Sequence, residues 1–267
     1  MRYIGRYLRV YFTMMVLAIF WVGCSSFISK TSQQTPEEDY LAVTGALEVL
    51  SRLKTQNQEL KSFKGIGKIK LWLEGELKID ERIAWIGADP NKLSIVVLVS
   101  GYPAIKIAND GKWFYYYEAN QDQPIYKKIR ATDASLKRLL SIKITPGEII
   151  ALLKGRVPLR EHDSAFLHQN NTTGGFVLIL KKKWWGVTEK VFLDQKKTQV
   201  SLMEFFSRSG SIGYRAQFKE MQSISGYQVP SRLYLSNKEG STIQLDIQSY
   251  WTDVPVSSEM FVLSPPE

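Results

Sequence analysis

The feature that most constrains the fold is an alternation of apolar and polar side chains that begins at Phe63. Phe63, Ile69 and Leu71 fall on one face of this segment, and its lysines fall on the other. Because successive side chains of a β-strand point to opposite sides, the pattern predicts a strand with one buried face. It returns in short segments up to Tyr250, separated by turn residues such as Asn109-Asp110-Gly111. The sequence therefore predicts a mainly β (α+β) fold with two runs of five or six antiparallel strands.

One helix is predicted before the strands. Thr35 provides an N-cap, Pro36 suits the first helical position, and Glu38 completes a capping box. Apolar residues then recur at helical spacing to about Gln56. The expected apolar stripe of this helix consists of Tyr40, Val43, Leu47, Leu50 and Leu53.

Helical spacing interrupts the strands once, over about residues 134–154. Leu136, Leu139 and Leu140 indicate a short first helix, and the segment from Thr145 to Leu153 indicates a second. A large sheet must cover its apolar face, and these two helices are the available plug. We therefore expect a curved half-barrel whose apolar interior is closed by a helical lid.

That apolar interior is the candidate binding site. Each of its residues, taken singly, is better explained as core, but the sheet offers more apolar surface than two short helices can cover. An acyl chain would fit such a space. The cavity residues predicted from the sequence are Phe63, Ile69, Leu71, Leu93, Ile95, Val97, Ile107, Leu139, Ile149, Leu152 and Leu153.

The N-terminus has the organisation of a lipoprotein signal peptide over residues 1–23. Three arginines precede a short apolar stretch, which ends in Trp21-Val22-Gly23 immediately before Cys24. Cys24 is the only cysteine of the chain, so we expect its thiol to accept a diacylglycerol group. Residues 24–36 are polar and aperiodic, which predicts a flexible tether to a single domain at residues 37–267.

An uncleaved membrane anchor is the alternative explanation of this segment. Val10 to Ser29 carries no charge, and about 20 residues are enough to span a bilayer. The second half of this stretch contains Gly23, Cys24 and three serines, which suit a spanning helix poorly.

Ser25 stands where an aspartate would favour retention in the inner membrane of enteric bacteria. The expected location is therefore the periplasmic face of the outer membrane, by a lipid anchor.

Charge favours membranes over nucleic acid as a partner. Without the three arginines of the signal peptide, the formal net charge of +9 falls to +6, spread along the chain. A mild excess of this kind favours anionic lipid head groups, and its spread is unlike a nucleic-acid footprint. The sharpest cluster is Lys181-Lys182-Lys183 beside Trp184-Trp185. This cluster is either a solvated strand end or a basic and aromatic rim against a membrane.

The sequence contains no pattern that indicates catalysis. His162 and His168 lie in a stretch that reads as a loop, and with Asp163 they match no standard metal site. No phosphate-binding loop, metalloprotease helix motif or nucleophile elbow is present. We therefore expect a non-enzymatic protein with no catalytic residues, no metal and no cofactor other than the covalent lipid on Cys24.

Four segments resemble the LolA/LolB superfamily of bacterial lipoprotein carriers, and LolB-like outer-membrane lipoproteins in particular. They match the family in order across nearly the whole domain, although none is specific by itself. The matching segments are Leu50 to Leu73 with Phe63-Lys64-Gly65-Ile66-Gly67, Leu93 to Ile107, Asp133 to Pro158, and Pro230 to Trp251.

The resemblance implies an unclosed β-barrel whose cavity, under a helical lid, holds acyl chains of lipoproteins or lipids. In LolB a leucine on a projecting loop helps deliver cargo into the membrane, and Tyr102 occupies the matching position here. The C-terminal extension from Val254 to Glu267 exceeds what LolB needs and is expected to cover an edge strand. The implied partners are acyl chains, the membrane surface, and a periplasmic LolA-like carrier or an envelope complex. The alternative function is a structural or adaptor lipoprotein with the same fold and a filled interior.

Overall fold

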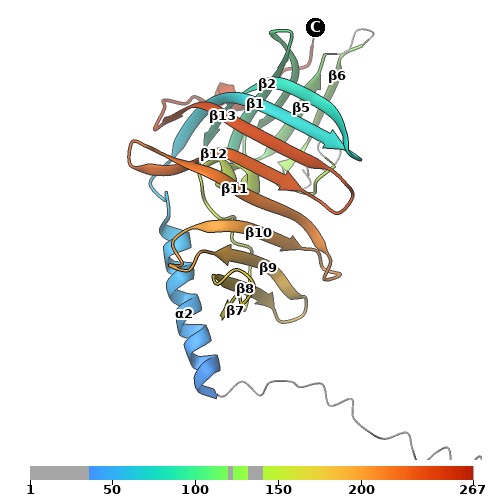
Figure 1. The fold of residues 1–267 in the computed structure, drawn as a ribbon. Coiled ribbons are helices and arrows are strands. Elements are labelled where there is room, and N and C mark those ends of the chain that lie inside the picture. Colours follow the sequence, from blue (N-terminus) through green and yellow to red (C-terminus); the bar gives the residue numbers. More distant parts are fainter. Residues whose placement is uncertain (1–35, 120–122, 132–140, 267) are drawn as a thin grey trace, which may run out of the picture. The chain divides into compact units, whose positions relative to one another are not determined.

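The computed structural model describes residues 36–119, 123–131 and 141–266. Thirteen strands form a single antiparallel sheet in the order β6-β5-β4-β3-β2-β1-β13-β12-β11-β10-β9-β8-β7 (Figure 1). Its two edges, β6 and β7, are not paired with each other, so these strands form an unclosed sheet. The predicted fold class, a mainly β and unclosed curved barrel, is confirmed.

Two meanders build the sheet. The first contains β1 (Ser62–Leu73), β2 (Glu76–Ala88), β3 (Lys92–Val99), β4 (Tyr102–Asn109), β5 (Trp113–Glu118) and β6 (Ile125–Arg130). The second contains β7 (Ser164–Gln169), β8 (Phe176–Lys182), β9 (Gly186–Leu193), β10 (Val200–Phe206), β11 (Ile212–Ile224), β12 (Tyr227–Ser236) and β13 (Thr242–Thr252). Pairing of β1 with β13 joins the two meanders, so the connection from β6 to β7 must lead from one edge of the sheet to the other.

Two strands differ from the sequence-based expectation. Both edge strands were missed, and the stretch that reads as a loop around His168 contains β7. β6 has the sequence Ile-Tyr-Lys-Lys-Ile-Arg and is mostly exposed, so it lacks the apolar alternation of a half-buried strand. Because few side chains of either edge strand are buried, its apolar face is short and its sequence signal is weak.

Helix α2 (Pro36–Thr55) begins at Pro36, as predicted, and ends one residue before the expected Gln56. From residue 44 onward its buried residues are Ala46, Val49, Leu50 and Leu53, whereas Leu47 is 61% exposed. The prediction for Leu47 was therefore wrong. One residue corresponds to a rotation of about 100° around a helix, so Leu47 lies beside the Ala46 stripe instead of within it. A side-chain carbon added at Gly45 would contact Leu167, so this part of α2 packs on β7.

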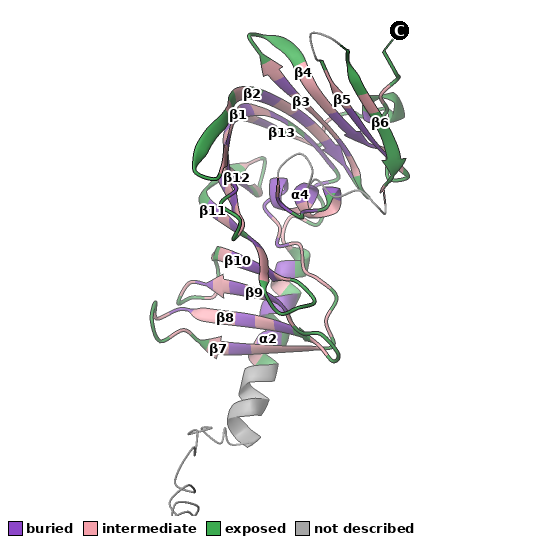
Figure 2. Ribbon diagram, turned by 90° about the vertical axis from the view of Figure 1, so that its right-hand side faces the viewer, coloured by how far each residue is buried: buried purple, intermediate pink, exposed green. Residues whose placement is uncertain are grey.

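Helix α4 (Pro146–Leu153) lies in the connection between the two edge strands. It occupies the buried side of the sheet, inside its curve (Figure 2). The predicted second lid helix is thus present at the expected residues. The first predicted lid helix, with Leu136, Leu139 and Leu140, lies outside the described residues, as do the signal peptide, Cys24 and most of the tether.

Residues 40–267 form one compact unit with a hydrophobic core along the inner face of the sheet. The C-terminal extension contains a short 3₁₀ helix, η2 (Ser258–Phe261), whose Phe261 is fully buried. Beyond it, the Tyr126 hydroxyl of edge strand β6 donates a hydrogen bond to the carbonyl oxygen of Leu263 at 3.0 Å. The extension therefore contacts an edge strand, as expected. Among the described helices, none combines the length and apolar character needed to cross a bilayer.

Candidate functional site

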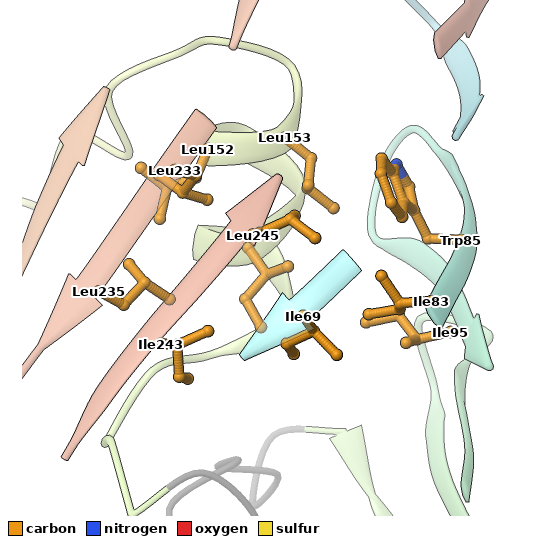
Figure 3. Close-up of a pocket in the computed structure, with 11 residues that line it drawn as sticks. Ile69, Ile83, Trp85, Ile95, Leu152, Leu153, Leu233, Leu235, Ile243 and Leu245 are labelled. Carbon is orange, nitrogen blue, oxygen red and sulfur yellow. The ribbon is translucent and has the colours of Figure 1, made fainter. Parts of the chain in front are cut away.

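An apolar cavity lies between α4 and the inner face of the sheet (Figure 3). The side chains around it come from α4 and from strands β1, β2, β3, β12 and β13, and all are hydrocarbon except for the indole nitrogen of Trp85. Its volume is about 70 Å³. The lining residues are Ile69, Ile83, Trp85, Ile95, Ile149, Leu152, Leu153, Leu233, Leu235, Ile243 and Leu245.

Strand register explains why these residues share one face. Ile69 of β1 stands opposite Leu245 of β13, which in turn stands opposite Leu233 of β12. On the other side of β1, Trp85 of β2 stands opposite Ile95 of β3. Directly opposed residues project from the same face of an antiparallel pair, so the apolar alternation of each strand adds to one continuous inner wall.

A glycine in β1 makes room for the largest of these side chains. Gly65 is paired with Trp85, and a carbon atom added at Gly65 would overlap the indole ring. The neighbouring pair repeats the arrangement, because a carbon added at Gly87 would overlap the ring of Phe63. Gly65 in β1 and Gly87 in β2 thus each allow an aromatic ring of the neighbouring strand to lie across them.

Five of the cavity residues predicted from the sequence line the observed cavity, namely Ile69, Ile95, Ile149, Leu152 and Leu153. Another five, Phe63, Leu71, Leu93, Val97 and Ile107, belong to the surrounding hydrophobic core without lining it. Leu139 lies outside the described residues. Sequence reasoning missed Ile83, Trp85, Leu233, Leu235, Ile243 and Leu245. Their period-two spacing was the available signal, but only pairing of β1 with β13 brings them to the same wall.

The C-terminal end of α4 is fixed by four contacts with surrounding elements. Lys154 is 1% exposed, and its ammonium group pairs with the Asp89 carboxylate at 2.9 Å. The Tyr250 hydroxyl donates to the carbonyl oxygen of Leu153 at 3.1 Å. The side-chain amide of Asn57 donates to the Lys154 carbonyl oxygen at 2.6 Å, and that of Gln56 to the Gly155 carbonyl oxygen at 2.9 Å. The carbonyl groups of Leu153, Lys154 and Gly155, at and just beyond the end of the helix, are therefore satisfied by side chains.

The N-terminal end of α4 is fixed by a capping box and an ion pair. The Thr145 side chain accepts a hydrogen bond from the Glu148 backbone, and the Glu148 carboxylate accepts one from the Thr145 backbone. The other oxygen of Glu148 accepts hydrogen bonds from Arg160 Nε at 3.1 Å and Nη2 at 2.8 Å. Arg160 Nη1 donates to the Phe206 carbonyl oxygen at 2.9 Å. Arg160 thereby ties the start of α4 to the second meander.

A buried carboxyl group lies beside this ion pair. Glu189 is fully buried, and its Oε2 accepts a hydrogen bond from the Arg160 backbone nitrogen at 3.0 Å. Its Oε1 has no hydrogen-bond partner among the described residues. Burial raises the pKa of Glu189 to about 8, against the lowering effect of that hydrogen bond. Glu189 is therefore mainly protonated at neutral pH. Burial also raises the pKa of the neighbouring Tyr214 hydroxyl.

The cavity is too small for an acyl chain while α4 occupies the inside of the sheet. Its volume of about 70 Å³ is less than the roughly 150 Å³ of a cavity that holds one benzene molecule. The side chains of Ile149, Leu152 and Leu153 form the α4 side of this cavity and limit its size. In this structure α4 therefore leaves no room for an acyl chain in the cavity beneath it.

Two other groups of predicted residues lie away from the cavity. Tyr102, at the turn between β3 and β4, is 78% exposed. The Nδ1 atom of His162 lies 2.8 Å from the Arg160 carbonyl oxygen, and the ring of His168 stacks on that of Phe166 at 6.4 Å. In the part of the chain that the structure describes, no three His, Cys, Asp or Glu side chains gather as metal ligands would.

No family model and no curated protein sequence matches this chain. Solved structures do match. A DUF1329 family protein from Desulfovibrio piger has a TM-score of 0.56 and 11% identity, over 83% of this chain and 97% of its own. A LolA superfamily protein from Nitrosomonas europaea has a TM-score of 0.54 and 16% identity, over 83% of this chain and 98% of its own. A candidate outer membrane lipoprotein-sorting protein domain from Vibrio parahaemolyticus has a TM-score of 0.55 and 12% identity, over 82% and 97%. These likenesses establish the fold of the chain as one shared with LolA superfamily proteins, and they do not single out LolB.

Proposed function

We propose that this chain is a membrane-tethered, non-enzymatic member of the LolA/LolB superfamily that binds acyl chains of lipoproteins or lipids. The observation that carries the proposal is the wall beneath α4, whose side chains are all hydrocarbon except for the indole nitrogen of Trp85. Such a wall offers nothing to orient a polar substrate, whereas each methylene group transferred onto it contributes about 0.8 kcal/mol. The shared fold with LolA superfamily proteins supports the same assignment.

Binding requires α4 to leave its position, and the chemistry of the wall makes this exchange feasible. The acyl chain would replace Ile149, Leu152 and Leu153 against the same side chains, so one apolar contact substitutes for another. The net cost of opening then lies in the polar contacts at the two ends of the helix, chiefly Lys154 with Asp89 and Glu148 with Arg160. A ligand shifts the lid only by its difference in affinity for the open and closed states.

The proposal includes a location and partners. Lipidation of Cys24 would tether the domain to the membrane, and Ser25 favours the periplasmic face of the outer membrane. The exposed Tyr102 turn would contact the bilayer when cargo is delivered there, because a tyrosine has both an apolar ring and a polar hydroxyl. A periplasmic LolA-like carrier would supply lipoproteins.

Native mass spectrometry tests the binding function directly. The Ser25–Glu267 chain, which contains the whole compact unit, would be purified and offered an acylated peptide. We expect retained or added acyl ligand, and loss of that ligand in Ile95→Glu. Val96→Glu is the matched control, since Val96 is the next residue of β3 and points to the opposite face. An apo mass throughout, without uptake of acylated peptide, would refute acyl-chain binding.

A structural or adaptor role is the second candidate, and the small cavity volume favours it. In that case α4 would remain in place as a permanent part of the core. The same experiment separates the two functions, because an adaptor would co-purify with an envelope protein and would show no mass shift with acylated peptide.

A further inference from the structure

The turn between β8 and β9 carries an unusual group of side chains. We call Lys181, Lys182, Lys183, Trp184, Trp185 and the neighbouring Arg208 the basic–aromatic surface. Trp184 is 84% exposed, more than any other large hydrophobic side chain in the described residues, and Trp185 is 41% exposed. Neither ring is needed to fill the core, so their exposure requires another explanation.

Each cation of the basic–aromatic surface lies over an aromatic ring. The Lys183 ammonium is 5.6 Å from the centroid of the Trp184 ring, and that of Lys182 is 4.6 Å from Trp185. The Arg208 guanidinium, from the turn between β10 and β11, lies 4.4 Å from the same Trp185 ring. The surface therefore joins two hairpins, and cation–π contacts hold its side chains in place.

The surface has an excess of positive charge. Its four cations face two carboxylates, Glu161 and Asp163. Glu161 pairs with Lys182 at 2.7 Å, and the Asp163 carboxylate accepts a hydrogen bond from the Lys183 backbone at 2.6 Å. Neither Lys183 nor Arg208 has a carboxylate partner among the described residues, so both remain available to an external anion.

Strand register places this surface at the same end of the strands as the Tyr102 turn. The turns β1–β2 and β12–β13 are adjacent at that end, because Trp72 pairs with Thr242. Neighbouring strands of the sheet run in opposite directions, so successive turns alternate between its two ends. The β3–β4 turn on one side of this pair and the β8–β9 turn on the other therefore lie at the same end as the β1–β2 turn. Both halves of the sheet thus present exposed aromatic residues at this end of their strands.

We propose that the basic–aromatic surface binds the head-group region of an anionic lipid bilayer. Tryptophan is enriched at membrane–water interfaces, where lysine and arginine contact lipid phosphates. Nucleic acid is disfavoured because the net positive charge of the chain is spread along its sequence instead of forming one extended basic stripe. This contact goes beyond the proposed function, since it does not depend on an occupied cavity.

Vesicle flotation tests the proposal. The Ser25–Glu267 chain lacks the lipid anchor and would be mixed with vesicles of phosphatidylcholine alone or with phosphatidylglycerol added. We expect binding to the phosphatidylglycerol vesicles only, weakened by salt. Lys183→Gln should reduce affinity about fivefold, since one cation near the surface contributes on the order of 1 kcal/mol. Trp184→Ala should reduce it by roughly tenfold.

Two further variants make the test specific. Glu161→Gln removes a carboxylate from the surface and should tighten binding about fivefold, a gain that loss of folding cannot imitate. Trp251→Ala is the matched control, because Trp251 is 43% exposed and lies 5.1 Å from the Lys64 ammonium near the opposite end of β13. It should bind as the unaltered chain does.

Several results would overturn the proposal. Equal binding to both kinds of vesicle would exclude the electrostatic contact. Unchanged binding in Trp184→Ala and Lys183→Gln would place the membrane contact elsewhere. Short single-stranded DNA would be added as a competitor at the same concentration of negative charge as the vesicles. If the DNA abolishes vesicle binding, the surface binds polyanions in general instead of a bilayer.

Discussion

Replacing Glu189 by glutamine should remove most of the pH dependence of stability that this carboxyl group creates. Glu189 has a folded-state pKa of about 8 against an ordinary value of 4.5, because it is buried. Between these two values the folded protein binds one more proton than the unfolded chain, so the free energy of unfolding falls as pH rises. One pKa unit corresponds to about 1.4 kcal/mol, so the loss between pH 5.5 and pH 8.5 is roughly 3 kcal/mol.

Urea unfolding at pH 5.5, 6.5, 7.5 and 8.5 measures this effect. In Glu189→Gln the amide oxygen still accepts the hydrogen bond from the Arg160 backbone, but the side chain no longer ionises. The variant should therefore gain stability relative to the unaltered chain by about 3 kcal/mol from pH 5.5 to 8.5. Val191 lies two residues further along the same strand and is fully buried. Val191→Ala should therefore lower the free energy of unfolding by an amount that does not change with pH. Parallel pH profiles for the unaltered chain and Glu189→Gln would show that the carboxyl group is not protonated in the fold.

Three further predictions concern α4 and its surroundings. Leu152→Ala removes a fully buried side chain from the cavity wall and should lower the free energy of unfolding in urea by about 4 to 5 kcal/mol, because the new space joins an existing cavity. Benzene should bind in the enlarged cavity and raise the Tm of this variant. If benzene does not raise the Tm, the wall has collapsed into the new space. Gly155→Ala should lower the free energy of unfolding by more than about 2 kcal/mol, since Gly155 has a φ of +70° and an added carbon would overlap the β12 backbone. Gly226→Ala is the control, because Gly226 has a φ of +86° but open space around it, and it should cost only about 1 kcal/mol. Equal costs for the two variants would contradict the overlap at Gly155. Lys154→Met leaves the Asp89 carboxylate without its partner and should lower the free energy of unfolding by about 2 to 3 kcal/mol. This cost is smaller than for a fully buried pair because Asp89 is 36% exposed. Unchanged stability in the same urea assay would show that the pair does not fix the helix.

Local sequence patterns predicted much of the fold because they act through neighbouring residues. The alternation of Phe63, Ile69 and Leu71 with lysines assigns a buried face to β1 without knowledge of its partners. Thr145, Pro146 and Glu148 specify the start of α4 through a cap and a capping box, both of which form within four residues. Edge strands β6 and β7 were missed because few of their side chains are buried, which leaves them without that alternation.

The candidate site, by contrast, depends on pairings between residues distant in the chain. The apolar character of Ile69 and Leu152 is evident from the sequence, but the wall they share includes Leu245, which reaches Ile69 only through pairing of β1 with β13. Likewise, Glu189 in isolation reads as an ordinary strand residue, and only its burial in the folded chain raises its pKa. The sequence by itself thus determined which faces are apolar and where α4 begins. Only the tertiary structure decided which faces meet and how far α4 fills the space between them, because both depend on long-range strand register and on the packing of a helix inside the sheet.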